Sequence, residues 1–338
     1  MSKIKVAING LGRIGNQVLR HYIHQLPENC EIVAANTSSV ADAAYLLKYD
    51  SVHGRADFSI ETVGNEKLIV DGHEIAIVSS HDPLQLPWKE LGIDIVLECT
   101  GHFTEGSAAA QHITAGAKKV IISAPGKNVD KTIVLGVNHE EYDPANHHVL
   151  SNASCTTNSL APAMKVLEEN FGVEYAMITT THAYTSTQTT VDKRAKKRRR
   201  GRAAAVNIIP TTTGAAIATT EVIPALKGKM EAMALRVPVP DGAITEIVAL
   251  LKKEATADAV NDAFKAAAEG ELRGILDITF DEVVSTDILG NRHSSIIDGL
   301  STSTVGPRMV KALAWYDNEY GYSQRLLELA DYVAGKMG

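Results

Sequence analysis

The residue types best suited to chemistry stand in the stretch Ser151–Asn158, where a single cysteine lies among small polar residues. The positions after it repeat with helical spacing, at Leu160, Met164 and Leu167. This pattern predicts Cys155 in the first turn of a helix, although Pro162 leaves the helix boundary open. Unpaired backbone N–H groups and the positive end of the helix dipole favour a thiolate there. Cys155 is therefore a candidate nucleophile beside a place for an anion, the alternative being a buried structural cysteine.

A second motif, Gly10-Leu11-Gly12-Arg13-Ile14-Gly15, follows the strand candidate Ile4–Ile8 and precedes a helical pattern. Strand, glycine turn and helix in this order are typical of dinucleotide binding. Gly10 permits the tight turn, Gly12 lets the backbone approach a pyrophosphate, and Gly15 allows the helix to pack closely on the strand. The alternative is a glycine-rich turn without a ligand.

The segment after the second predicted strand, Glu31–Asn36, bears on the choice of dinucleotide. NAD enzymes usually carry an acidic residue about 20 residues past the glycine motif, for the ribose 2′-OH. This chain has Thr37 and Ser38 there, and Asp42 is expected further on, in a helix. Loss of the acid removes repulsion toward a 2′-phosphate, and the hydroxyls could donate to it. NADP is favoured over NAD, unless backbone and water replace the acid.

The order of predicted elements indicates two domains in 338 residues. Strands alternate with helices in the first half, including Lys67–Val70, Ile75–Val78, Asp94–Gly101 and Lys118–Gly126. Longer strand candidates follow Cys155, namely Tyr175–Thr181, Ala232–Val237, Ile244–Leu251, Gly270–Thr279 and Asp281–Leu289. We predict an α/β protein: a Rossmann-type, mostly parallel sheet over 1–154, and an α+β catalytic domain with a mixed or antiparallel sheet over 155–317. The C-terminal segment 318–338 should form a helix that packs back on the first domain. Cys99, in an apolar strand, is expected to serve packing.

Composition excludes several classes of protein. No apolar run reaches the roughly 18 residues of a membrane span, and a net charge of −7 argues against nucleic-acid binding by the whole chain. Three cysteines, odd in number and far apart, argue against a disulfide framework. With no signal peptide visible, we expect a cytoplasmic protein. No metal site is predicted.

With Cys155, His182 and the glycine motif together, the chain resembles the phosphorylating glyceraldehyde-3-phosphate dehydrogenases over essentially its whole length. The other matching pieces are Leu47–Gly54, Ser151–Asn158, His182–Thr185, Thr213–Ala216, Arg236–Pro240 and Trp315–Glu319. The resemblance implies that the Cys155 thiolate attacks an aldehyde and that His182 ionises the cysteine, steadies the oxyanion and takes the hydroxyl proton. Hydride transfer to NAD(P) would leave a thioester, which inorganic phosphate would convert to an acyl phosphate. Cysteine and histidine form a common activated pair.

The resemblance also implies binding residues. The substrate phosphate would bind Thr185, Arg200 and Arg236. Inorganic phosphate would bind Ser154, Thr156, Thr213 and Gly214. Besides the glycines and Thr37 and Ser38, the cofactor would contact Arg13, Ile14, His81, Ser123 and Asn318. Hydroxyl and backbone donors suit tetrahedral oxyanions, and arginine binds them in a bidentate manner. A homotetramer is implied as well, while the glycolytic or gluconeogenic direction is left open.

Some residues depart from the family pattern. Thr37 replaces the acidic residue of NAD-specific members, and His81 stands where an arginine or lysine commonly lies beside the adenine. The strongly basic loop Lys193–Arg202 is the most unusual feature. Three interpretations of it stay open: cations that hold a 2′-phosphate on a neighbouring subunit, a solvated loop with one substrate arginine, or a surface for nucleic acid or another partner. Two rival functions stay open for the chain: an erythrose-4-phosphate dehydrogenase, and a non-catalytic polyanion-binding protein that uses the basic loop.

Overall fold

The computed structural model describes residues 3–337, which form two compact units. One unit comprises the described residues up to Ile133, the segment His139–Ala153 and the described residues from Ser323 onward. The other comprises Val134–Asn138 and Ser154–Tyr322. Residues 1, 2 and 338, which the predicted first domain and C-terminal helix include, lie outside the described residues.

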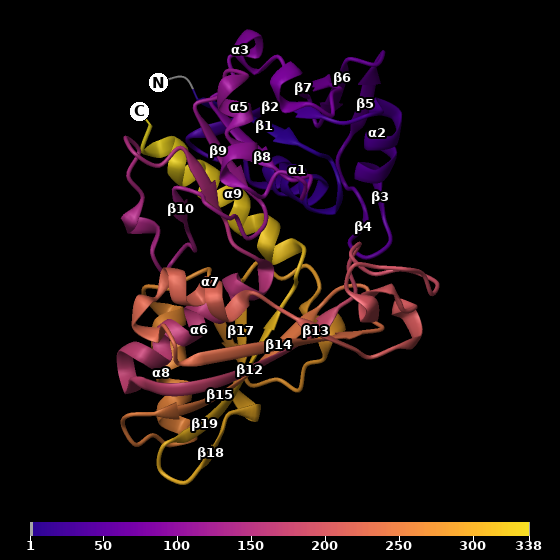
Figure 1. Cartoon of the computed structure of the whole chain (residues 1–338). Coiled ribbons are helices and arrows are strands. Elements are labelled where there is room, and N and C mark those ends of the chain that lie inside the picture. The colour runs from indigo at the N-terminus through magenta and orange to yellow at the C-terminus, as the bar shows by residue number, and fades with distance from the viewer. Residues whose placement is uncertain (1–2, 338) are drawn as a thin grey trace. The chain divides into compact units, whose positions relative to one another are not determined.

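The first unit contains a nine-stranded sheet in the order β10-β11-β9-β8-β1-β2-β7-β6-β5 (Figure 1). Its strands are β1 (Ile4–Asn9), β2 (Cys30–Asn36), β5 (Ile60–Val63), β6 (Lys67–Val70), β7 (His73–Val78), β8 (Ile95–Glu98), β9 (Lys119–Ile122), β10 (Lys131–Thr132) and β11 (Val149–Ser151). A separate small pair is formed by β3 (Tyr49–Asp50) and β4 (Gly54–Arg55). Every pairing from β10 to β7 is parallel, and only the β7–β6 and β6–β5 pairings are antiparallel. The predicted Rossmann-type sheet is confirmed.

The helices of this unit lie in the connections between its parallel strands. They are α1 (Arg13–Gln25), α2 (Val40–Lys48), α3 (Trp88–Leu91), α4 (Gly106–Ala109) and α5 (Gln111–Thr114). Helix α1 follows the glycine turn directly, so its N-terminus lies at the carboxyl end of β1, the edge where α/β sheets bind ligands.

The last helix, α9 (Tyr320–Gly335), is shorter at both ends than the predicted segment 318–338. From Ser323 onward it belongs to the first unit, where Leu326, Leu329 and Val333 are buried. Asp331 accepts from the backbone N–H of Asn29 at 2.8 Å. This carboxylate thus ties the helix to the turn before β2.

The second unit holds an eight-stranded mixed sheet, ordered β13-β14-β12-β15-β19-β17-β16, with β18 paired to β19. Its strands are β12 (Val173–Ala183), β13 (Ile209–Thr212), β14 (Met230–Val237), β15 (Ala243–Leu251), β16 (Leu276–Thr279), β17 (Ser295–Asp298), β18 (Ser303–Val305) and β19 (Met309–Tyr316). Its helices are α6 (Cys155–Phe171), α7 (Ala215–Val222) and α8 (Ala257–Glu269). Both parallel and antiparallel pairs occur, which confirms the predicted mixed sheet.

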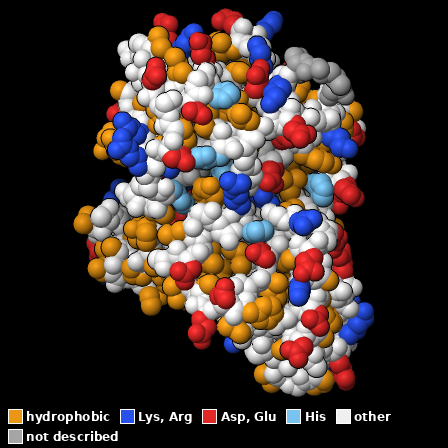
Figure 2. Space-filling view, turned by 180° about the vertical axis from the view of Figure 1, so that it is seen from behind, with side chains coloured by type: hydrophobic (Ala, Val, Ile, Leu, Met, Phe, Trp, Pro, Cys, Tyr) orange, Lys and Arg blue, Asp and Glu red, His pale blue; other side chains and the backbone are white. Residues whose placement is uncertain are grey.

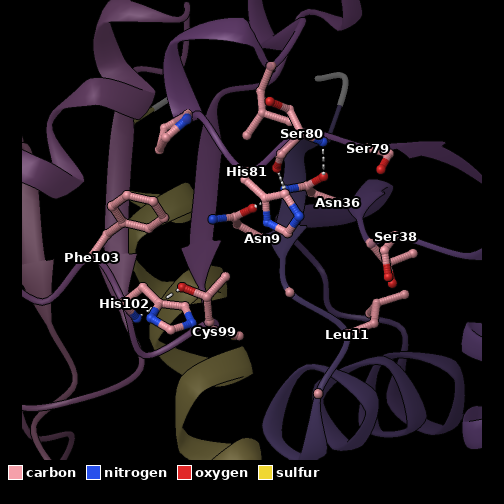
Figure 3. A pocket seen from close by; sticks show the side chains of 16 residues that line it. Asn9, Leu11, Asn36, Ser38, Ser79, Ser80, His81, Cys99, His102 and Phe103 are labelled. Carbon is pink, nitrogen blue, oxygen red and sulfur yellow. Dashed lines mark hydrogen bonds between the residues drawn. The ribbon is translucent and has the colours of Figure 1, made fainter.

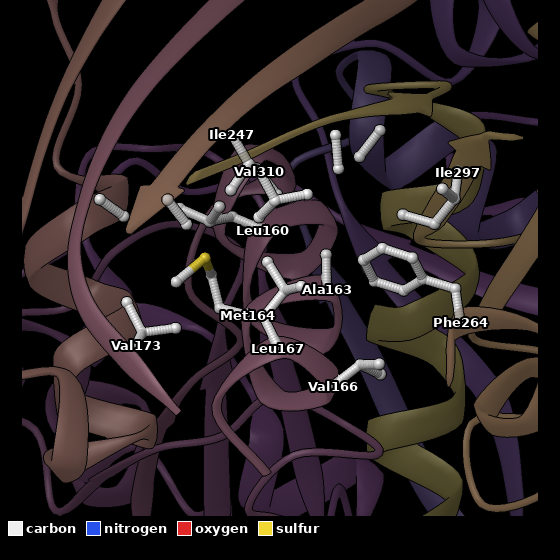
Figure 4. Packing of buried hydrophobic residues seen from close by; sticks show 14 of the residues in the cluster. Leu160, Ala163, Met164, Val166, Leu167, Val173, Ile247, Phe264, Ile297 and Val310 are labelled. Atoms are coloured by element: carbon white, nitrogen blue, oxygen red, sulfur yellow. The ribbon is translucent and has the colours of Figure 1, made fainter. Parts of the chain in front are cut away.

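One face of this sheet packs on α6 and α8 to form the core of the unit (Figure 4). Leu160 of α6 lies beside Ile247 and Val310 of the sheet, Met164 and Leu167 belong to the same cluster, and Phe264 of α8 closes one side. Burial alternates along β15, as expected for a strand with one covered face. Helix α6, which begins at Cys155, is therefore fixed by packing in the core.

Two expectations about this unit were wrong. Only Leu276–Thr279 of the predicted strand Gly270–Thr279 is a strand, and Asp281–Leu289 contains a 3₁₀ turn in place of a strand. Glycine interrupts the first stretch and aspartate the second, and both residue types favour turns. Helix α6 also continues through Pro162. Within residues 3–337, no helix combines the length and apolarity that a membrane span requires.

Candidate functional site

The centre of the site is a cysteine–histidine pair in the second unit. Cys155 is the first residue of α6, and the Ser154 hydroxyl caps this helix by accepting from the backbone N–H of Thr157 at 3.1 Å. His182 lies near the end of β12, where the predicted strand delivers it. The Cys155 Sγ and His182 Nε2 atoms are 3.4 Å apart. Helix start and strand end thus bring together the two residues that the sequence picks out.

Burial decides the electrostatics of this pair. Burial raises the pKa of the Cys155 thiol, and this outweighs the lowering by the charge of Arg236 and the hydrogen bonds of Thr156. The Thr156 backbone N–H at the helix start favours the thiolate, but desolvation penalises an isolated anion more. Burial, with Arg236 second, also lowers the pKa of His182. A buried thiol and a buried imidazole in contact hold one proton between them, so a charge on one favours the opposite charge on the other.

Arg236 reaches this pair through sheet register. Strand β14 runs parallel to β12, and Arg236 is the direct partner of His182. The Arg236 Nη1 atom lies 3.0 Å from His182 Nδ1 and donates to the Ala183 carbonyl oxygen at 2.8 Å. The Arg236 Nε atom is buried and has no hydrogen-bond partner within the described chain.

Tyr316 is a member of the site that sequence reasoning missed. Its hydroxyl lies 3.0 Å from Thr156 Oγ1 and 2.9 Å from Thr180 Oγ1. Its ring meets the His182 ring edge-on, with centroids 5.9 Å apart. The alternating burial of β19 places Tyr316 on the covered face of the sheet, and this periodicity in its sequence was the available signal.

The predicted substrate-phosphate residues are joined by a short chain of contacts. The Thr185 and Thr187 hydroxyl oxygens are 2.8 Å apart, and Arg200 donates from Nη1 to Thr187 at 3.4 Å. Arg200 also donates from Nε to the Thr211 hydroxyl at 2.9 Å. The charge of Arg200 lowers the pKa of Arg236, after burial. Two like charges that act on each other favour an anion between them.

The predicted inorganic-phosphate residues lie at the starts of two helices in contact, α6 and α7. Ser154 and Thr156 belong to the first turn of α6. Gly214 caps α7, and the Thr213 hydroxyl accepts from the Ala215 N–H at 3.2 Å. Helix starts of this kind supply backbone donors for an anion.

Half of the predicted dinucleotide residues line a cavity of about 540 Å³ in the first unit, at the carboxyl ends of β1, β2 and β8 (Figure 3). Its lining includes Gly10, Gly12, Thr37, Ser38 and His81. Among the described residues that line it, none carries a carboxylate, ammonium or guanidinium group. No negatively charged side chain in the cavity would therefore repel the phosphates of a dinucleotide.

Each glycine of the motif has a distinct surrounding. Gly10 has a φ of +100°, which disfavours other residues. A Cβ on Gly15 would lie 2.1 Å from the Gly10 carbonyl oxygen, whereas a Cβ on Gly12 would meet nothing within 4 Å. Gly15 thus allows the close packing that the sequence predicts, and Gly12 leaves open space.

Two family models match the chain. One, described as "Glyceraldehyde 3-phosphate dehydrogenase, NAD binding domain", matches residues 4–106, and the other, described as the C-terminal domain of the same enzyme, matches residues 154–318. A glyceraldehyde-3-phosphate dehydrogenase of Geobacillus stearothermophilus is 54% identical over 334 residues, which cover 98% of this chain and 99% of the relative. Similar relatives occur in Bacillus subtilis and Streptomyces coelicolor, each 51% identical over 336 residues, which cover 99% of this chain and 98% and 99% of the relatives.

The chain belongs to the glyceraldehyde-3-phosphate dehydrogenase family. The resemblance inferred from the motifs is confirmed. The family name fits a cysteine–histidine pair in one unit and a dinucleotide cavity in the other.

Several predicted cofactor residues of this family member lie elsewhere. Ile14, Gly15 and Ser123 do not line the cavity, and Arg13 pairs with Asp50 at 2.6 Å. Cys99, expected to serve packing, does line it. The site residue Asn318 lies in the second unit, where its Oδ1 atom is buried without a hydrogen-bond partner in the described chain.

A buried polar network at the wall of the cavity was also missed. Asn36 donates to Asn9 Oδ1 at 2.6 Å and to the Ser80 carbonyl at 2.8 Å, and it accepts from the Ser80 N–H at 3.0 Å. Asn9 in turn donates to Glu98 at 2.5 Å. The only sequence signal is the position of each side chain at the end of a parallel strand, which is where this fold binds ligands.

Proposed function

We propose that this chain oxidises glyceraldehyde 3-phosphate to 1,3-bisphosphoglycerate, reversibly, with inorganic phosphate and a nicotinamide dinucleotide. The observation that carries the proposal is the 3.4 Å contact between Cys155 Sγ and His182 Nε2 at the start of α6. A nucleophilic sulfur with a base in reach suits covalent catalysis at a carbonyl carbon. The names of the relatives point to the same reaction.

The chain's residues act in two stages. The Cys155 sulfur attacks the aldehyde carbon, its proton passes through His182 to the carbonyl oxygen, and a thiohemiacetal forms. His182 then takes the hydroxyl proton as the C–H bond loses its electron pair, which leaves a thioester on Cys155. The oxidised nicotinamide, when bound, supplies the acceptor for that hydride. A phosphate oxygen next attacks the thioester carbon, the C–S bond breaks, and Cys155 leaves as a thiolate that His182 stabilises.

The binding roles follow the resemblance. Thr185, Arg200 and Arg236 would hold the substrate phosphate, and the helix starts at Ser154, Thr156, Thr213 and Gly214 would hold inorganic phosphate. The residues present fit the cofactor, because the cavity of the first unit has room and no carboxylate. The partnerless Asn318 Oδ1 suits the amide N–H groups of a nicotinamide carboxamide.

Kinetics with Cys155→Ser and His182→Asn test the function. Cys155→Ser should abolish oxidation, since a serine hydroxyl is a far weaker nucleophile, while cofactor affinity stays within about twofold. His182→Asn should lower kcat by about 10²- to 10⁴-fold. Wild-type turnover that persists after Cys155 is alkylated would contradict the mechanism.

Two other functions can be distinguished from the proposed one by their substrates and by their response to Cys155→Ser. An erythrose-4-phosphate dehydrogenase would prefer the four-carbon aldehyde and would not require inorganic phosphate. Two features favour the triose and strict phosphate dependence: Thr185 after His-Ala-Tyr, and the two sets of residues predicted to bind phosphate. A non-catalytic polyanion-binding protein would use the basic loop and be indifferent to Cys155→Ser. On the face in Figure 2, acidic and basic side chains are interspersed, which does not favour that function.

We infer that the cofactor is NADP in preference to NAD. The cavity offers the hydroxyls of Thr37 and Ser38 and no carboxylate that would repel a 2′-phosphate. Asp42 lies on α2, where its backbone N–H bonds to the capping Ser39 hydroxyl at 3.1 Å. Steady-state kinetics with both cofactors should give a higher kcat/KM for NADP, and a higher value for NAD would refute the inference.

The basic loop is proposed to assist NADP binding on an adjacent subunit. Arg200, Lys197 and Arg202 are engaged by Thr211, Thr212 and Asp192 respectively. The remaining cations, Lys193, Arg194, Lys196, Arg198 and Arg199, are exposed. Charge reversal of Lys193, Arg194 and Lys196 should weaken NADP much more than NAD, and equal weakening would refute this role.

A homotetramer is proposed for the assembly. The face of the mixed sheet opposite α6 exposes large apolar side chains, with Tyr175 at 61% and Met177 at 62% exposure, beside Met309. Apolar patches of this kind fit a second copy of the chain. The free thiols of all three cysteines support a reducing, cytoplasmic location.

A further inference from the structure

In the second unit, the Arg236 guanidinium lies directly beside His182, the residue proposed as the base. His182 is 3% exposed, and the Arg236 Nη1 atom lies 3.0 Å from its Nδ1. The same Nδ1 atom lies 2.7 Å from the Ala183 carbonyl oxygen, which can only accept, so Nδ1 carries the hydrogen of the neutral ring and Nε2 is left to accept a proton. The imidazolium form of His182 has a proton on both nitrogens and a positive charge. The guanidinium beside the ring therefore opposes this second proton by its charge.

The same guanidinium has an edge without a partner. Nη1 is committed to the Ala183 carbonyl at 2.8 Å, whereas Nε is buried and unpaired within the described chain. A buried donor without an acceptor is costly, and charged donors more so. The N–H groups of Nε and Nη2 form a fork that matches two oxygens of a phosphate. An anion can therefore bind this edge while Nη1 stays on the other side.

The surroundings leave Arg236 as the main cation near the base. The charged groups that act on His182 are Arg236, Arg200 and Glu319, and the first outweighs the other two. The neutral neighbours are the Ala183 carbonyl at 2.7 Å, the Cys155 thiol at 3.4 Å and the edge-on Tyr316 ring. Neutralising Arg236 would change the field at His182 more than any other single event.

We propose that Arg236 couples the substrate's phosphate to the base: an anion on its Nε edge offsets the positive charge that opposes protonation of His182. This inference rests on the proposed function. It goes beyond phosphate binding, because the occupied site makes His182 a stronger proton acceptor when the phosphorylated aldehyde is in place. An aldehyde without a phosphate would meet a weaker base.

The first test needs neither substrate nor cofactor. The rate of Cys155 alkylation by iodoacetamide is measured against pH in the wild type, Arg236→Gln, Arg236→Lys and Arg200→Gln. The charge of Arg236 lowers the pKa of both the Cys155 thiol and His182, so in Arg236→Gln both limbs of the pH profile should move upward by about one pH unit. Arg236→Lys keeps the charge and should stay closer to the wild type. Arg200→Gln, which does not contact His182, is the matched control and should move the limbs less. Limbs that stay in place in Arg236→Gln overturn the proposal, whatever the protein's substrate.

The second test compares glyceraldehyde with its 3-phosphate. The pre-steady-state burst of reduced nicotinamide is followed against pH. In the wild type, the acid limb should lie about one pH unit higher with the phosphorylated aldehyde. In Arg236→Gln this separation should vanish, while in Arg200→Gln it should persist with a raised KM. A separation that persists in Arg236→Gln would arise from the ester's own ionisation and would overturn the coupling. Failure to turn over either aldehyde would instead refute the proposed function.

Discussion

Replacing Gly15 by alanine should damage the first unit in a way that can be calculated. The new Cβ would lie 2.1 Å from the Gly10 carbonyl oxygen, 3.1 Å from the Gly10 carbonyl carbon and 3.2 Å from the Ile8 Cγ2 atom. The Cβ and the oxygen must separate by about 1 Å to reach an ordinary contact. The oxygen belongs to a backbone turn and cannot rotate aside, so the start of α1 must move away from β1.

The size of the effect follows from two opposing contributions. Forcing extra volume into a packed region costs about 1–3 kcal/mol. Alanine is a better helix former than glycine by up to about 1 kcal/mol, which offsets part of this. We expect Gly15→Ala to lower the free energy of unfolding by about 2 kcal/mol. Because the helix start also carries the N–H groups meant for the pyrophosphate, the Kd of the dinucleotide should rise more than tenfold.

Gly12→Ala is the matched control within the same motif. Its φ of −83° and ψ of −158° are open to any residue, and its Cβ would meet nothing within 4 Å. The free energy of unfolding should change by less than about 0.5 kcal/mol. Dinucleotide affinity should nevertheless fall, because the new methyl group occupies the space where the backbone would approach the phosphates.

Urea unfolding at a fixed protomer concentration measures both variants. The chain has two tryptophans, so a Trp315→Phe background leaves only Trp88, which is fully buried in the first unit, as the fluorescent probe. Equal unfolding midpoints for Gly15→Ala and the wild type would refute the packing argument. A loss of stability in Gly12→Ala as large as that in Gly15→Ala would refute it as well.

Two further predictions concern buried polar groups. Tyr316→Phe should lower the free energy of unfolding by about 1–2 kcal/mol in urea titrations, because the Thr156 and Thr180 hydroxyls lose their buried partner; no change would show that the hydroxyls pair with each other or with water instead. Burial raises the pKa of the Cys30 thiol far above its ordinary value of 9.0. The folded state therefore keeps a proton that the unfolded state loses, and stability should fall above about pH 9, by about 1.4 kcal/mol per pH unit more in the wild type than in Cys30→Ala. Equal slopes in urea titrations from pH 8 to 10.5 would contradict this.

How much of the site could be predicted from the sequence depended on whether the signal was local. Strand, glycine turn and helix are continuous in the chain, so the roles of Gly10, Gly12 and Gly15 could be assigned from the order of residues alone. The same holds for Cys155, whose helix start shows in the residues around it. Its electrostatics could not be assigned, because the burial that raises the thiol pKa comes from the fold of the whole unit.

The parts that the sequence did not reveal depend on neighbours in space. Arg236 could be matched to a phosphate role, but its contact with His182 depends on the parallel register of β12 and β14. Asn9 and Asn36 look like ordinary polar residues at strand ends, and only the sheet order places them side by side. The predicted strand Asp281–Leu289 was wrong although its signal was local. Its apolar residues lie in a turn and a 3₁₀ segment.

In the hydrogen-bond network at the dinucleotide cavity, every donor faces an acceptor in one fixed order along the row. The Trp88 indole N–H donates to His112 Nδ1 at 3.0 Å, which leaves the hydrogen of this imidazole on Nε2, facing Glu98 at 3.2 Å. Glu98, as a carboxylate, only accepts, so the Asn9 amide nitrogen faces it and the Asn9 carbonyl oxygen accepts from Asn36. The carboxylate at one end and the Ser80 backbone at the other thus order both amides of the row. Reversing any single amide would set two donors or two acceptors face to face, so the row has one arrangement and no mirror-image alternative.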